Sequence, residues 1–174
     1  PNHNNPQTIA LGQRWASQFD SKLDIVNQAL RMFREQEYVY TLQPPLLGEN
    51  ASDEFLFKTR RGFCEHYASS FALLMRAAGI PARIVTGYQG GEINQVGNYL
   101  IVRQSDAHAW TEVWLQDRGW VRIDPTAAVS PDRIEKGLDQ ALNNPFSNFK
   151  IGKHNQLLGK LLYNWDNLQH NWND

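Results

Sequence analysis

The stretch from Gly62 to Ala68 reads Gly-Phe-Cys-Glu-His-Tyr-Ala and opens the most regular segment of the chain. From Cys64 to Ala78 apolar residues recur with helical spacing, and a glycine and a proline soon follow. That pattern predicts one long helix that begins at Cys64 and ends at a glycine C-cap. Because a helix N-terminus carries free N–H groups and partial positive charge, a cysteine there is a candidate reactive thiolate. The alternative is a buried cysteine that packs as a small apolar residue.

Beyond Pro81 the spacing of apolar residues shortens toward two, which is typical of β-strands. The segments with this pattern are 82–88, 99–104, 108–115 and 120–124. Because Arg118-Gly119 offers a turn between the last two, we expect them to pair as an antiparallel hairpin. The N-terminal part predicts helices between 6 and 36, a short extended piece at 37–42, and a helix that starts at Ser52 with acidic residues in its first turn. Helices followed by an antiparallel sheet predict an α+β fold.

A histidine opens the third expected strand. His108 shares one strand face with Trp110, Glu112 and Trp114, because side chains on a strand alternate between its faces. A base beside aromatic rings in a partly dry groove is suited to activating a thiol, and Trp110 is the candidate wall of that groove. The alternatives are a histidine that is an ordinary polar residue and tryptophans that serve packing alone.

An aspartate ends the fourth expected strand. The turn at residues 117–119 folds this strand back along the third, which brings Asp124 opposite His108 or within about one diagonal pair. A carboxylate at that position can hold an imidazole in one tautomer and orientation. The alternative is that Asp124 before Pro125 only ends the strand and starts a turn.

Several segments together resemble the transglutaminase-like superfamily, in that family's order and spacing. They are Gly62-Phe63-Cys64-Glu65-His66-Tyr67-Ala68, Ala78-Gly79-Ile80-Pro81-Ala82-Arg83, Thr86-Gly87-Tyr88, Asp106-Ala107-His108-Ala109-Trp110 and Asp124-Pro125-Thr126. The sequence is most similar to the extracytoplasmic domains of bacterial membrane-anchored protein-glutamine gamma-glutamyltransferases. The resemblance implies a papain-like α+β core and a Cys–His–Asp triad at Cys64, His108 and Asp124.

The resemblance also implies a reaction. It is the transfer of a glutamine acyl group to a primary amine through a thioester on Cys64, with a protein or peptide as substrate. The alternative is a thiol hydrolase, a peptidase, amidase or deamidase that acts on extracytoplasmic or cell-wall peptides. A third interpretation is a non-catalytic binding module, which the intact triad argues against. The backbone N–H of Cys64 is one expected oxyanion donor, and Tyr40 is the candidate for the second because no tryptophan occupies that stretch.

The 174 residues predict a single domain, with a catalytic core at about 40–133 and flanking helices at 6–36 and 154–173. A formal net charge of -1 offers no basic surface for nucleic acid. The single cysteine excludes an intramolecular disulfide. Cys64-x-His66 has no second close pair of ligands beside it, so we expect neither a metal nor a cofactor.

The chain begins with Pro1 rather than methionine, and we expect a fragment or a processed product. No apolar run approaches the roughly 18–20 residues that a membrane span needs. The resemblance implies that the parent chain is membrane-embedded and that this part is a periplasmic domain of a bacterial inner-membrane protein.

Overall fold

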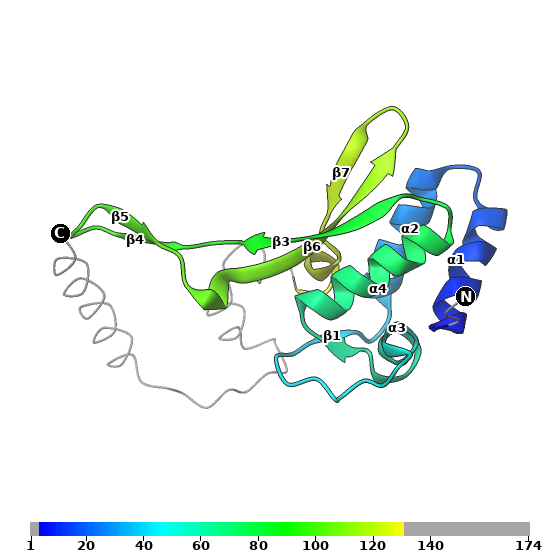
Figure 1. The fold of residues 1–174 in the computed structure, drawn as a ribbon, viewed down its shortest axis with the longest axis horizontal. Coiled ribbons are helices and arrows are strands. Elements are labelled where there is room, and N and C mark those ends of the chain that lie inside the picture. The colour runs from blue at the N-terminus through cyan, green and yellow to red at the C-terminus, as the bar shows by residue number, and fades with distance from the viewer. Residues whose placement is uncertain (1–3, 131–174) are drawn as a thin grey trace.

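The structure is a computed structural model, and it describes residues 4–130. Its centre is helix α4 (Cys64–Ala77), which packs against an antiparallel sheet of three strands (Figure 1). The sheet has the order β3-β6-β7, with β3 at Ala82–Tyr88, β6 at Ala107–Leu115 and β7 at Gly119–Ile123. The predicted α+β class, the long helix and the C-terminal hairpin are therefore found.

The remaining elements surround this centre. The N-terminal helices are α1 (Pro6–Gln18) and α2 (Lys22–Glu35), followed by the short strand β1 (Val39–Tyr40). Next come α3 (Ala51–Asp53), the π-helical turn η1 (Glu54–Thr59) and β2 (Arg61–Gly62). A second hairpin is formed by β4 (Glu92–Asn94) and β5 (Tyr99–Ile101), and two 3-10 turns are η2 (Gln104–Asp106) and η3 (Pro125–Ala128). The predicted helix at 154–173 lies outside the described residues.

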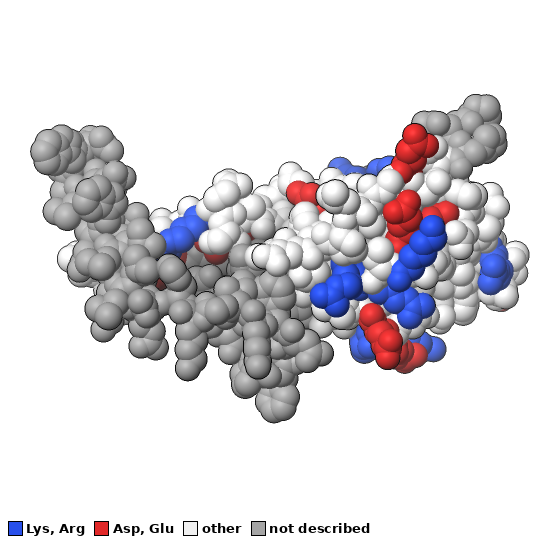
Figure 2. Space-filling model, turned by 90° about the horizontal axis from the view of Figure 1, so that it is seen from below, with Lys and Arg blue, Asp and Glu red and all other residues white. Residues whose placement is uncertain are grey.

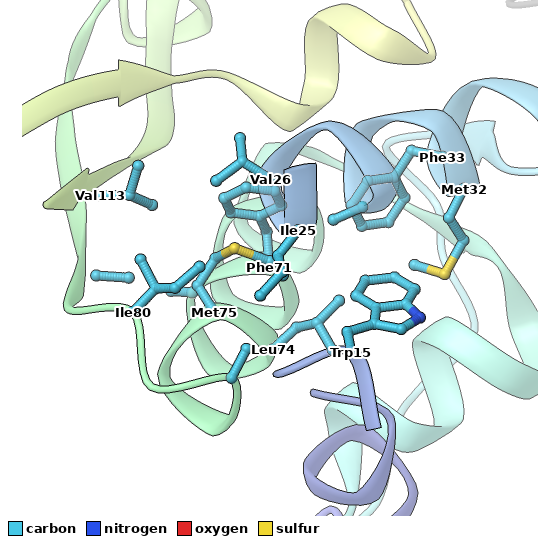
Figure 3. Packing of buried hydrophobic residues seen from close by; sticks show 14 of the residues in the cluster. Trp15, Ile25, Val26, Met32, Phe33, Phe71, Leu74, Met75, Ile80 and Val113 are labelled. Atoms are coloured by element: carbon cyan, nitrogen blue, oxygen red, sulfur yellow. The ribbon is translucent and has the colours of Figure 1, made fainter. Parts of the chain in front are cut away.

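The core fills the space between α1, α2, α4 and the sheet (Figure 3). Val26 and Phe33 of α2 meet Phe71 and Met75 of α4, and each is at most 1% exposed. Val113 of β6 is fully buried on the sheet side of the same cluster. Burial of side chains of this size stabilises the fold by roughly 1.5–3 kcal/mol each, so α4 is fixed between two layers.

Two helix starts cap each other across the sequence. The Asn5 side-chain oxygen accepts the N–H groups of Ser52 and Asp53, at 2.9 and 3.2 Å. In return, one Asp53 oxygen accepts the N–H and the hydroxyl of Thr8, at 2.7 and 2.6 Å. A helix start at Ser52 with acidic residues in its first turn was predicted, and α3 begins one residue earlier, at Ala51, with Asp53 in its first turn. Asp53 is only 2% exposed, and its carboxylate accepts hydrogen bonds from α1, which the sequence did not indicate.

The strand expected at 99–104 is shorter than predicted. It ends at Ile101, because the Asp106 carboxylate accepts the Arg103 N–H at 2.8 Å and closes the turn η2. This strand pairs with β4 rather than with the main sheet, through the register Ile93↔Leu100. The resulting hairpin extends away from the body, from the end of β3 that adjoins the start of β6 (Figure 1).

Charged side chains are mixed on the face that Figure 2 shows, where Lys and Arg lie among Asp and Glu. Within residues 4–130, no helix is both long enough and apolar enough to cross a membrane.

Candidate active site

Cys64 is the first residue of α4, as the sequence predicted. Its N–H therefore belongs to the groups at a helix start that lack an intrahelical acceptor. The side chain is 8% exposed and packs with Ala68 and with Ala109 of β6. The Thr111 hydroxyl donates to the Ala68 carbonyl at 3.0 Å, which ties this first turn of α4 to the sheet.

The segment just before Cys64 is closely packed. Tyr40 of β1 pairs with Gly62 of β2 in parallel, and the Tyr40 ring stacks on Tyr67 with centroids 6.5 Å apart. A Cβ atom on Gly62 would lie 2.7 Å from the Cβ of His66, so only glycine fits there without displacement. Tyr40 thus lies beside the segment that leads to Cys64, and its oxyanion role stays a prediction.

The His66 side chain contacts the backbone at the start of its own helix. Its Nδ1 accepts the Phe63 N–H at 3.4 Å, across the start of α4. Burial of the ring lowers the pKa of His66 below its ordinary value, even though the Glu65 charge acts in the opposite direction. Among the described residues, no group of three or more His, Cys, Asp or Glu side chains is arranged to hold a metal ion.

His108 and Asp124 meet across the hairpin. Strands β6 and β7 pair with the register Thr111↔Ile123, which places Asp124 one diagonal pair from His108. His108 Nε2 lies 2.7 Å from Asp124 Oδ2, and the two side chains are 0% and 10% exposed. The other oxygen, Oδ1, accepts the Thr126 N–H at 3.2 Å. Asp124 therefore contacts His108 and also starts the turn η3, and its role in orienting a catalytic imidazole stays a prediction.

The surroundings of His108 favour its protonated form. Burial is the largest influence and lowers the pKa of His108, but hydrogen bonds and charge interactions with Asp124 and Cys64 outweigh it and raise the pKa above its ordinary value. Because Asp124 occupies Nε2, Nδ1 is the ring nitrogen left for Cys64. Nδ1 is buried without a hydrogen bond of good geometry, and in resting sites such bonds are often long.

Trp110 lies beside the histidine. Its ring stacks on His108 with centroids 6.2 Å apart and planes at 24°, and it also covers Gly87 of β3. A Cβ on Gly87 would lie 3.1 Å from Trp110 Cη2, which explains the glycine in Thr86-Gly87-Tyr88. Trp114 is 42% exposed and meets Trp120 edge to face, so it is not a core residue. The groove role of Trp110 stays a prediction.

Three arginines lie on strands or near their ends. Arg83 forms an ion pair with Glu112 at 2.7 Å, and Arg103 forms one with Glu92 at 2.9 Å. Sequence reasoning did not identify Arg122, which contacts Asp124 Oδ2 at 3.4 Å. Its only sequence signal is position, because the next-to-last residue of a strand shares a face with the residue that follows the strand.

Residues 11–125 match the model of the Transglutaminase-like superfamily, and this range includes all three residues of the site. The chain belongs to this superfamily.

This member of the superfamily is similar to named proteins. It is 44% identical over 180 aligned positions, covering 99% of its own length, to the protein-glutamine gamma-glutamyltransferase of Pseudomonas aeruginosa. It spans only 27% of the length of that relative. The crystal structure of the periplasmic domain of TgpA from Pseudomonas aeruginosa matches with a TM-score of 0.79 and 51% identity, over 82% of this chain and 49% of that one. The chain thus corresponds to part of a periplasmic domain.

A more distant structure shares the fold alone. The putative cysteine protease from Cytophaga hutchinsonii matches with a TM-score of 0.50 and 21% identity, over 74% of this chain and 39% of that one.

In the transglutaminase-like domain described here, a thiol at a helix start lies near a buried imidazole, and a carboxylate holds that imidazole. Such an arrangement can form an acyl-thioester, because the imidazolium stabilises a thiolate and can later donate a proton.

Proposed function

We propose that this domain is a thiol acyltransferase that moves the acyl group of a glutamine side chain to a primary amine. One observation carries the proposal: His108 and Asp124 form a buried pair joined at 2.7 Å, and His108 also interacts with Cys64 at the start of α4. The activity named for the relative of 44% identity supports the choice of glutamine as acyl donor.

In the first half-reaction, the Cys64 thiolate attacks the carboxamide carbon of the glutamine. The carbon–sulfur bond forms as the carbonyl π electrons move to oxygen, and the Cys64 N–H is positioned to stabilise this oxyanion. When the carbonyl re-forms, the carbon–nitrogen bond breaks and the His108 imidazolium gives its proton to the departing ammonia. A thioester on Cys64 and a neutral imidazole remain. Tyr40 is our candidate for a second oxyanion donor.

In the second half-reaction, a primary amine attacks the thioester. His108 accepts a proton from the amine, the carbon–sulfur bond breaks, and an isopeptide bond and the thiolate–imidazolium pair result. Asp124 holds the imidazole by Nε2 throughout, which keeps Nδ1 available for the reacting groups. If water replaces the amine, the same steps give a glutamate, and the outcome is deamidation.

We also propose that the domain acts outside the cytoplasm, as one part of a longer membrane-embedded protein. Its similarity to a periplasmic domain and its coverage of only 27% of a curated relative support this placement. The substrates would then be periplasmic proteins or peptides that carry an accessible glutamine and an amine.

The test is incorporation of a fluorescent primary amine into a glutamine-containing protein, with ammonia release recorded in parallel. Wild type should label the protein and release ammonia, and Cys64→Ala should do neither while it unfolds at an unchanged urea concentration. The activity should fall by about 10⁴-fold or more, because loss of a triad nucleophile removes the covalent route.

Two results would contradict parts of the proposal. Ammonia release without label would identify a hydrolase that acts on the same glutamine. Label that persists in folded Cys64→Ala would reject Cys64 as the nucleophile.

A further inference from the structure

The guanidinium group of Arg122 contacts three other side chains. Its Nη2 donates to Gln89 Oε1 at 2.7 Å and lies 3.4 Å from Asp124 Oδ2. Its Cζ lies 4.4 Å above the centre of the Trp110 ring. The three partners come from the segment after β3, from the end of β7 and from β6, so the side chain joins three separate segments of the main sheet.

These contacts restrain a side chain that is half exposed. The Arg122 side chain is 49% exposed, and an ordinary surface ion pair at that exposure contributes little to stability. A planar guanidinium that is stacked on a tryptophan and bonded at its edge loses less freedom when it adds a further contact. Arg122 can therefore hold a neighbouring carboxylate more firmly than a free surface charge would.

That neighbour is the oxygen on which His108 depends. Asp124 Oδ2 lies 2.7 Å from His108 Nε2 and 3.4 Å from Arg122 Nη2, while Oδ1 accepts the Thr126 N–H. Oδ2 of the carboxylate thus lies near two nitrogen atoms, one of the imidazole and one of the guanidinium, while Oδ1 has the Thr126 N–H as its donor. Without Arg122, its remaining restraints are the backbone of the turn η3 and the imidazole itself.

We propose that Arg122, anchored by Gln89 and Trp110, is a positioning residue that holds the Asp124 carboxylate in its contact with His108. This role rests on the proposed function, in which Asp124 orients the catalytic imidazole. The contacts of Arg122 are with Gln89, Trp110 and Asp124 rather than with Cys64 or His108, so its effect on the imidazole is indirect.

The direction in which the pKa of His108 changes when Arg122 is replaced separates a positioning role from a purely electrostatic one. The titratable groups that act on His108 are Cys64 and Asp124, and Arg122 adds a positive charge behind the carboxylate. A positive charge alone disfavours an imidazolium, so its removal would raise the pKa of His108. Loss of positioning weakens the hydrogen bond to Asp124, which would lower the pKa of His108 instead.

The experiment is an NMR titration of the His108 ring in the folded domain, assigned by the signal that His108→Gln loses. In Arg122→Met the pKa of His108 should fall, and amine incorporation should fall about 10-fold, the lower end of the loss seen when a partner that orients a functional histidine is removed. Arg122→Lys keeps the charge but not the planar fork, and should restore only part of the activity.

The chain supplies a matched control. Arg83 lies 4.3 Å from the centre of the Trp120 ring and 2.7 Å from Glu112, so it has the same kinds of contact away from the triad. Arg83→Met should leave both the His108 titration and the transfer rate unchanged. An unchanged or raised pKa of His108 in folded Arg122→Met would overturn the inference. The titration needs no substrate, so it remains decisive even if wild type shows no transferase activity.

Discussion

A single methyl group added at Gly62 should displace the Cys64 thiol. Gly62 has no positive φ, so its backbone accepts alanine and the cost is steric alone. The new Cβ would lie 2.7 Å from the Cβ and 2.8 Å from the Cγ of His66, and 2.9 Å from Cε2 of Phe55. Because the Phe55 ring is 0% exposed and the Cβ of His66 belongs to the first turn of α4, neither neighbour can move freely.

The expected size follows from these distances. Carbon atoms in contact prefer roughly 3.5–4.0 Å, so the start of α4 and the strand before it must separate by about 1 Å. Overpacking of this kind costs about 1–3 kcal/mol of stability. A displacement of about 1 Å between reacting groups can cost about 100-fold in rate, and Cys64 is only two residues from the added methyl.

The assay is alkylation of Cys64 by iodoacetamide, read by mass, beside urea unfolding and amine incorporation. Cys64 is the only cysteine in the chain, so the label reports this thiol alone. Gly79→Ala is the matched control, because Gly79 has a φ of 74° and no described atom within 4 Å of its added Cβ. The Gly79→Ala variant should lose about 1 kcal/mol of folding stability through backbone strain, and its Cys64 should react with iodoacetamide as in wild type. If Gly62→Ala alkylates and transfers within twofold of wild type, the approach to Cys64 does not position the thiol.

Two further changes test the frame around the site. Gly12→Ala should lower the free energy of unfolding in urea by about 1–2 kcal/mol, because the new Cβ would lie 2.6 Å from the Cβ of Ala77. This overpacking outweighs the higher helix propensity of alanine. A gain in stability would show that α1 and α4 are not closely packed at this point. Since the pKa of His66 is lowered in the folded state, its contribution to stability is complete above about pH 6.5 and is lost as pH falls below that value. Urea unfolding at several pH values should show this loss in wild type and not in His66→Gln, and equal slopes would contradict the assignment.

Much of the site follows from local pattern. The period of apolar residues after Cys64 and the glycine that ends the helix are visible in the sequence, and they place the thiol at a helix start. A strand, a short turn and a second strand fix the partners of a hairpin within a residue or two, which is sufficient to bring Asp124 to His108. Local periodicity therefore predicts the elements that carry the three candidate residues, and it limits the register of the hairpin to within a residue or two.

Long-range side-chain contacts could not be predicted in this way. Nothing near Asp53 in the sequence shows that its carboxylate faces Thr8, because that choice depends on how two helix starts meet in space. From the sequence alone, Arg122 is likewise an ordinary exposed strand residue, and only the structure shows its contacts with Gln89 and Trp110. Such contacts join segments whose relative placement the whole core decides, and no periodicity encodes them.

The mutual capping of the two helix starts also has a consequence for how the domain is made. Its hydrogen bonds join residues 45 to 48 positions apart, from Asn5 and Thr8 to the start of α3. A ribosome releases the N-terminus first, so α1 leaves the exit tunnel with its first turn uncapped and gains its acceptor only when Asp53 follows. Short helices without tertiary contacts are marginal in water. The first turn of α1 is therefore capped only when the segment that leads to Cys64 has folded against it. The starts of α1 and α3 should form and open as one cooperative unit.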